Sequence, residues 1–178
     1  LFRSAIEIAV AYDEDDNDSD AFFQSSDWRE LIDSYGAQDQ VFKTPKWGYV
    51  NLHNYYNLMA QNSQGQWLLI WNDDATVITP NWDQYVADAN NYVGMLHADC
   101  TTYSKLTLFP IFPKKWIDLF GTISLSNHID SWIADICIAA DAVKNTPILV
   151  YHDRYSETGN NNDQTYQERS RAGKKVYK

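Results

Sequence analysis

The chain has 178 residues, 44% of them hydrophobic and 15% aromatic, which is enough apolar surface for the core of one domain and excludes a disordered chain. Its net charge of -10 disfavours nucleic acid partners, and it repels anionic substrates unless a bound cation reverses the local field. The longest apolar run, Trp67 to Trp71, is far shorter than the roughly 20 residues of a membrane span, so we predict no span.

Strand and helix patterns alternate along most of the chain. Strands are predicted where short runs are apolar and β-branched, and helices where apolar residues recur every three or four positions. In chain order the predictions are a strand over 6–12, a helix over 27–35 capped by Asp27 and ended by Gly36, a brief strand at 41–42, a helix over 51–63 stopped by Gly65, a strand over 67–71, a helix over 80–89, a strand over 92–96, a turn bracketed by Pro110 and Pro113, a short helix through Trp116 and Leu119, a helix over 130–143 and a strand over 148–151. This alternation predicts one α/β domain with a mostly parallel central sheet flanked by helices.

The end of the chain differs in composition from the rest. Residues 156–178 are polar and become basic, so we predict a tail or lid there and place the folded domain at residues 1–155. Cys100 and Cys137 fit no metal-ligand spacing, and either buried thiols in a reducing compartment or a disulfide would explain them. No signal-peptide pattern is present, which favours a cytoplasmic protein. Because the chain begins at Leu1 and not at methionine, we expect that a preceding segment has been removed or left out.

Polar clusters follow three of the predicted strands. Asp13 to Asp16 follow the first strand, Asn72 to Asp74 follow the strand over 67–71, and His152 follows the last strand. In open α/β sheets, ligands gather outside the carboxyl ends of the strands. We therefore expect the three clusters to meet in one crevice.

Asp73 and Asp74 are the sharpest of these features. Adjacent carboxylates after a buried strand repel each other unless a cation or water relieves the repulsion. Mg²⁺ and Mn²⁺ prefer oxygen ligands and bridge carboxylates to phosphates, and an imidazole from His152 would suit Mn²⁺ better than Ca²⁺. The pattern indicates a metal-assisted phosphate site, although two aspartates that only cap the turn would give the same sequence.

Other carboxylates also have two interpretations. A carboxylate just after the first strand could accept hydrogen bonds from a ribose hydroxyl or a base, but residues 13–18 would also suit a solvated charged loop. Asp130, at the start of a predicted helix, could be its N-cap. It could equally be a general base that takes the proton of an acceptor hydroxyl, and the two roles do not exclude each other.

Several short segments recur in an order typical of one known family. These segments are Glu7 to Val10 leading to Asp13 to Asp16, Tyr56 to Ala60 with Gly65, Trp67 to Ile70 ending in Asn72 to Ala75, Phe109 to Phe112, Gly121, Asp130 to Ile133, and Val150 to Asp153. In this order and spacing they resemble the family 2-like glycosyltransferases, over roughly residues 5 to 155. The resemblance implies a Rossmann-like GT-A fold and metal-dependent transfer of a sugar from a UDP- or GDP-sugar donor to a carbohydrate or other hydroxyl acceptor, with inversion.

The resemblance also implies roles for individual residues. The turn over 72–74 matches the DxD-type motif that holds Mn²⁺ or Mg²⁺ against the nucleotide diphosphate, with Asn72 in the first position, so that Asp74 is the stronger metal ligand. In the same way it assigns nucleotide contacts to Asp13, Asp15 and Asp73, the catalytic base to Asp130, and a second metal contact to His152.

Two departures from the family pattern support a rival interpretation. The family usually opens with a strand that contributes to the nucleotide pocket, and this chain matches from after that strand. The arginine-bearing pattern that usually follows the base is also absent, because residues 136–140 carry no charge. The rival is a catalytically inactive carbohydrate- or nucleotide-binding module with the same fold. A metal-dependent phosphohydrolase is a third interpretation, and it would need a clearer water-activating cluster.

Overall fold

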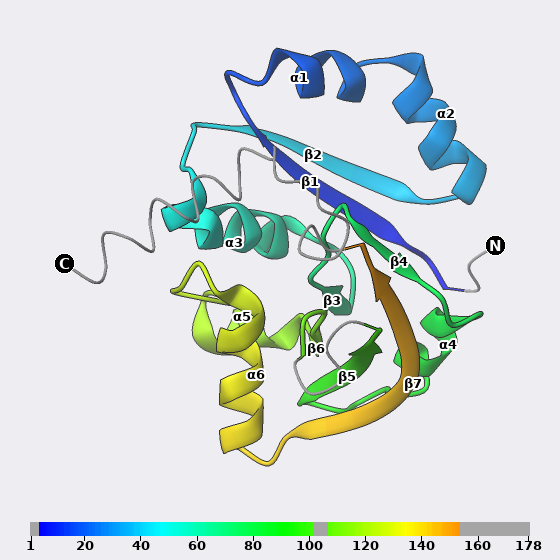
Figure 1. The fold of residues 1–178 in the computed structure, drawn as a ribbon, viewed down its shortest axis with the longest axis vertical. Helices are drawn as coiled ribbons and strands as arrows, with labels where there is room; N and C mark the ends of the chain where they lie inside the picture. Colours follow the sequence, from blue (N-terminus) through cyan, green and yellow to red (C-terminus); the bar gives the residue numbers. More distant parts are fainter. Residues whose placement is uncertain (1–3, 102–106, 154–178) are drawn as a thin grey trace.

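The computed structural model describes residues 4–101 and 107–153, in which strands and helices alternate (Figure 1). The elements are β1 (Glu7–Asp13), α1 (Asn17–Phe23), α2 (Ser26–Tyr35), β2 (Gln38–Thr44), the 3-10 helix η1 (Tyr49–Asn51), α3 (Leu52–Asn62), β3 (Trp67–Leu69), β4 (Ala75–Val77), α4 (Trp82–Ala87), β5 (Met95–Cys100), β6 (Ile111–Pro113), α5 (Lys115–Phe120), α6 (Ile129–Ala139) and β7 (Val143–His152). The predicted boundary between domain and tail at residue 155 lies outside the described residues.

The strands form two separate sheets. β1 and β2 pair in parallel, with Glu7 opposite Gln38 and Asp13 opposite Thr44. The other five follow the order β3-β6-β5-β7-β4, in which only β5 and β7 run parallel. The α/β class is confirmed, but the mostly parallel sheet is wrong. The prediction failed because β4 and β6 have three residues each, too few to show a periodic pattern. β6 lies in the predicted turn at 110–113.

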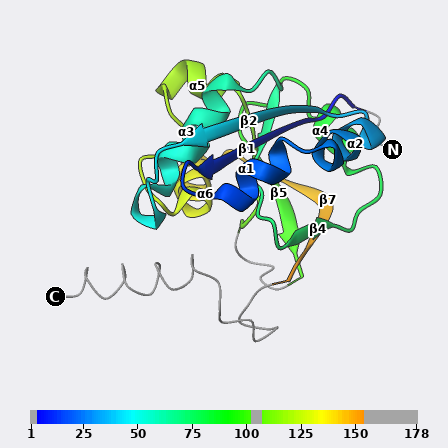
Figure 2. The same cartoon turned by 90° about the horizontal axis from the view of Figure 1, so that it is seen from above.

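Helices cover both faces of the β1–β2 pair. Figures 1 and 2 show α1 and α2 on one face, and α3 lies on the other. Trp28 and Ile32, four residues apart on α2, are buried, and the Trp28 indole donates to Asp39 Oδ2 on β2 over 2.7 Å. Ser25 caps α2, one residue before its first turn, so the predicted Asp27 cap is wrong. Gly36 ends this helix at φ 62°, as predicted.

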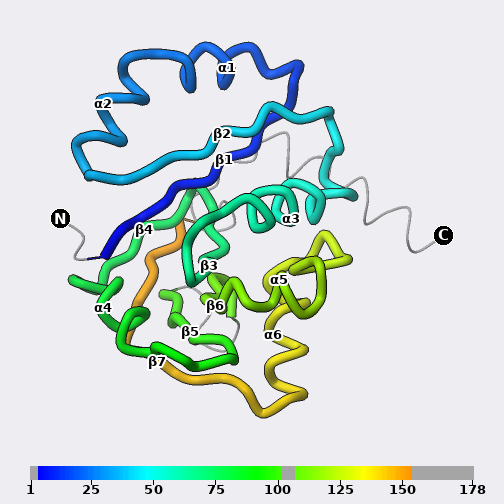
Figure 3. The backbone as a smooth tube through the Cα atoms, turned by 180° about the vertical axis from the view of Figure 1, so that it is seen from behind, coloured from blue at the N-terminus to red at the C-terminus, as the bar shows by residue number. Residues whose placement is uncertain are grey.

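Glu7 fastens the start of β1 to the turn that joins α3 to β3. Its Oε2 accepts hydrogen bonds from Ser63 Oγ at 2.8 Å, from the Gln64 amide at 2.7 Å and from the Gly65 amide at 3.1 Å. A carboxylate that satisfies this many donors explains why α3 ends at Asn62, before the predicted Gly65 stop. The path from α3 through this turn into β3 can be followed in Figure 3.

The five-stranded sheet has a hydrophobic core on each face. Successive side chains of β5 point to opposite faces of the sheet, so Met95 contributes to one core and Leu96 and Ala98 to the other. The first core contains Phe112 and Ile133 and joins the sheet to α3, α5 and α6. The second contains Val86 of α4. Within the described residues, no helix has the length and apolar character needed to cross a bilayer.

Element boundaries in the C-terminal half differ from the predictions. α6 ends at Ala139, four residues early, and Asp141 at φ 51° turns the chain into β7. β7 starts at Val143, well before the predicted strand over 148–151, because polar residues at 144–146 interrupt the apolar run and give no alternating pattern. β5 starts at Met95 and continues to Cys100. Cys100 and Cys137 are both buried free thiols, so the disulfide alternative is wrong.

Gly94 lies where the chain enters β5, against the backbone of the α6–β7 turn. A Cβ at this position would stand 2.2 Å from the Ala142 carbonyl oxygen, which accepts the Met95 amide hydrogen bond at 2.9 Å. We expect Gly94→Ala to lower the free energy of unfolding by about 1–3 kcal/mol, because backbone must move to admit the methyl group. Urea unfolding followed by tryptophan fluorescence measures the loss. Gly65→Ala is the control with a milder contact, 3.2 Å to the Trp67 carbonyl oxygen, and an equal loss in both variants would contradict the steric explanation.

Candidate functional site

Asp74 and His152 meet at the carboxyl end of β7. The antiparallel pairing of β4 with β7 places Ala75 opposite His152, and the Asp153 amide donates to the Asp74 carbonyl over 2.8 Å. The Asp74 Oδ1 and His152 Nε2 atoms are 3.0 Å apart. The His152 side chain is 6% exposed and that of Asp74 is 31% exposed, so a ligand can approach the pair from the aspartate side. Asp74 and His152 therefore lie side by side, as expected, and their role in a site stays a prediction.

Aromatic packing fixes the His152 ring. The fully buried Phe109 makes an edge contact with the imidazole, with ring centroids 5.3 Å apart. Trp71, which precedes the acidic turn, packs in turn on Phe109, with ring centroids 5.1 Å apart. The histidine and the acidic turn are therefore held by one aromatic cluster.

Tyr56 of α3 binds the backbone just before the acidic turn. Its hydroxyl donates to the Trp71 carbonyl oxygen over 3.2 Å. Burial raises the pKa of Tyr56 to about 12, with further contributions from the negative charges of Asp130 and then Asp73. The charges of Asp73 and Asp130, which lie far apart in the sequence, thus both act on this hydroxyl.

Asp130 lies in the first turn of α6. The N-cap of this helix is His128, so the interpretation of Asp130 as the cap is wrong. Asp130 is half-buried, and its Oδ1 accepts the Ser131 amide over 2.8 Å. A partly exposed carboxylate can exchange a proton with a bound molecule, so Asp130 as a general base stays a prediction.

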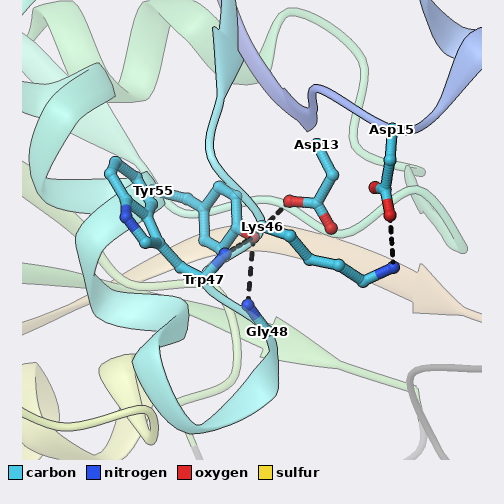
Figure 4. Close-up of polar contacts among 6 residues, drawn as sticks. All are labelled: Asp13, Asp15, Lys46, Trp47, Gly48 and Tyr55. Atoms are coloured by element: carbon cyan, nitrogen blue, oxygen red, sulfur yellow. Dashed lines mark hydrogen bonds and ion pairs between the residues drawn. The ribbon is translucent and has the colours of Figure 1, made fainter.

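Asp13 and Asp15 belong to a second cluster, at the carboxyl ends of β1 and β2 (Figure 4). The Tyr55 hydroxyl donates to Asp13 Oδ1 and accepts the Trp47 and Gly48 amides over 2.8 and 3.2 Å. Asp15 Oδ2 lies 3.1 Å from Lys46 Nζ. The cluster joins the loop after β1, the loop after β2 and helix α3.

The acidic loop after β1 is exposed over residues 14–18, as a solvated charged loop would be, and one of its carboxylates also caps a helix. Asp16 caps α1, with its Oδ1 accepting the Ser19 amide over 3.0 Å and its Oδ2 accepting the Ser19 hydroxyl over 2.7 Å. These two hydrogen bonds, that of the amide first, lower the pKa of the Asp16 carboxyl. Asp16 is thus used within its own helix, whereas Asp13 and Asp15 contact Tyr55 and Lys46.

Asp74 and His152 carry a carboxylate and an imidazole, which are groups that divalent cations take as ligands. The 3.0 Å between Asp74 Oδ1 and His152 Nε2 is the distance of a direct hydrogen bond between the two side chains. In the described part of the chain, no group of three or more His, Cys, Asp or Glu side chains could hold a metal ion.

Sequence reasoning missed Tyr55, Tyr56 and Lys46. The two tyrosines were interpreted as part of the apolar face of the helix over 51–63. A buried tyrosine hydroxyl needs a hydrogen-bond partner, so two adjacent tyrosines on a core-facing helix are the signal that could have pointed to polar contacts. Lys46 gave no pattern of its own.

Comparisons with known proteins add no assignment to this geometry. Neither a scan against known protein families nor searches of curated proteins and solved structures found a match to this chain.

Proposed function

We propose that this chain is a glycosyltransferase domain that transfers a sugar from a UDP- or GDP-sugar to a hydroxyl acceptor with the help of Mn²⁺ or Mg²⁺. The observation that carries the proposal is the contact of Asp74 with His152, whose Oδ1 and Nε2 atoms are 3.0 Å apart, next to Asp73 in the chain. The charges of Asp130 and Asp73 both act on the buried Tyr56 hydroxyl. An acidic protein needs a cation to bind a diphosphate, and this turn supplies the donor atoms for one.

The roles of the residues follow from their positions. Asp74 and His152 would hold the cation, which offsets negative charge on the departing diphosphate. Asp73 would contact the nucleotide beside it, and Asp13 and Asp15 would offer carboxylate oxygens to the ribose or base from the end of β1 and the loop after it. Asp130 would accept the proton of the acceptor hydroxyl as its oxygen bonds to the sugar, which gives inversion.

A non-enzymatic nucleotide- or carbohydrate-binding module is the second candidate. It is favoured by one observation, that no three-residue metal-binding group occurs among the residues that the structure describes. Such a module would use the same contacts to bind a ligand and would not break the bond between sugar and diphosphate.

A donor panel separates the two candidates. The whole chain is incubated with UDP- and GDP-sugars and Mn²⁺, with and without a carbohydrate acceptor, and the released diphosphate is measured. We expect release with at least one donor, faster when an acceptor is present and stopped by a chelator. Binding of UDP or GDP without release from any donor would support the binding module. Absence of both UDP or GDP binding and release would contradict the glycosyltransferase and a nucleotide-binding module.

A further inference from the structure

Three consecutive residues of α3 each contact a different part of the candidate site. Tyr55 binds Asp13 and the loop after β2, and Tyr56 binds the Trp71 carbonyl before the acidic turn. Asn57 binds the loop that leads into α6. Successive helix residues point in directions about 100° apart, so one short stretch can reach three segments.

Asn57 makes the most complete set of these contacts. Its Oδ1 accepts the Ile123 amide at 2.9 Å and the Ser124 amide at 3.3 Å, and its Nδ2 donates to the Ser124 carbonyl at 2.8 Å. The amide side chain thus uses both ends on one backbone segment. A contact of this kind fixes the position of that segment and not only its distance from the helix.

Hydrogen bonds continue from this segment to the start of α6. The Ser124 hydroxyl, on a fully buried residue, donates to the Ser126 carbonyl over 2.8 Å and accepts the Ser126 amide over 3.0 Å. The Ser126 hydroxyl accepts the amide of His128, the N-cap of α6, over 3.1 Å. Asp130 follows two residues later, so Asn57 is joined to the first turn of α6 by an unbroken series of short contacts.

We propose that Asn57 is a positioning residue that holds Asp130 at its working distance from the acidic turn. The inference rests on the proposed function, because it assigns Asn57 a part in the proton transfer at Asp130. Tyr56, the preceding residue, bonds to the Trp71 carbonyl just before the acidic turn. Helix α3 therefore sets the spacing between the acidic turn and the first turn of α6. Asn57 itself touches neither substrate nor metal in this scheme, and acts only through the loop.

The test is a double-mutant cycle between Asn57 and Asp130. We expect Asn57→Ala to lower kcat by about 10- to 100-fold, as a displaced catalytic group does, with KM and Mn²⁺-dependent UDP or GDP binding changed by less than about twofold. In an Asp130→Asn background the same replacement is expected to change kcat by less than about twofold, because Asn57 then has no base to position. A merely structural asparagine would lower activity by the same factor in both backgrounds.

Two further variants keep the test decisive. Gln61→Ala is the matched control, since the exposed Gln61 also donates from α3 to this loop, over 3.2 Å to the Gly121 carbonyl, but does not reach the series that leads to Asp130. We expect its kcat to stay within about twofold of the wild type. If Asn57→Ala does not fold, Ser124→Ala replaces it, because this change removes the next hydroxyl in the series and leaves Asn57 in place.

The outcomes distinguish the inference from the function on which it rests. The inference is supported if the wild-type chain turns over substrate and Asn57→Ala lowers kcat only where Asp130 is present, not in the Asp130→Asn background. Wild-type turnover with equal losses in both backgrounds, or with no loss, overturns the inference and leaves the glycosyltransferase assignment standing. A wild-type chain that neither binds Mn²⁺ with UDP or GDP nor releases diphosphate overturns both.

Discussion

Asp130→Asn is expected to lower kcat for sugar transfer by about 10²- to 10⁴-fold, the usual loss when a general base is removed. The replacement keeps the size of the side chain and an oxygen that can accept the Ser131 amide, but it cannot take a proton from an acceptor hydroxyl. Binding of the donor should change little, because Asp130 is assigned to the acceptor. Initial rates at saturating donor and Mn²⁺, together with calorimetry of UDP or GDP binding, measure the two effects separately.

Asp135→Asn is the control for this prediction. Asp135 is an exposed residue of the same helix, so its replacement removes an equal charge five positions further along α6. We expect its rate to remain near that of the wild type. If Asp130→Asn retained more than half of the wild-type kcat, Asp130 would not be the base, and a different group would have to accept the proton.

Asp74→Asn is expected to abolish measurable Mn²⁺-dependent binding of UDP and GDP. Asparagine keeps an oxygen that can accept a hydrogen bond from His152 Nε2, 3.0 Å away, so the local fold should survive. What is lost is the negative charge and one strong ligand for a hard cation. Asp74→Ala should give the same loss, and calorimetry of nucleotide binding with and without Mn²⁺ measures it.

Charge alone must be separated from metal binding in this experiment. Asp88→Asn, at the exposed C-cap of α4, removes one negative charge from the protein and should leave nucleotide binding unchanged. Thermal melting of each variant shows whether the fold is intact. Undiminished Mn²⁺-dependent binding in Asp74→Asn would place the cation elsewhere, and the proposed function would lose its principal support.

Local patterns were sufficient to predict most elements of this fold. The helical spacing of residues 51–63 corresponds closely to α3, and the run at 6–12 corresponds to β1 within one residue. The short strands β4 and β6 were not predictable in this way, because three residues cannot show a period. Their antiparallel pairing is set by tertiary contacts, and it is this pairing that makes the larger sheet mixed.

The candidate site was predictable to a similar degree. The rule that polar residues gather at strand ends placed Asp74 and His152 together correctly, although β4 meets β7 through antiparallel pairing and not through the parallel sheet that motivated the rule. Asp13 and Asp15 were expected in the same crevice, and the structure places them in a cluster of their own around Tyr55 and Lys46. That arrangement depends on α3, whose polar contacts have no signature in the apolar pattern of the helix.

The division into two sheets has a consequence for how ligand binding can be detected. Asp13 ends a strand of the two-stranded sheet, whereas Asp74 borders a strand of the five-stranded one. Structural units of this kind open locally with their own free energies, which amide hydrogen exchange reports. A molecule bound by both carboxylates would tie the opening of one unit to that of the other, so it should slow exchange along β1 and β2 as well as along β7.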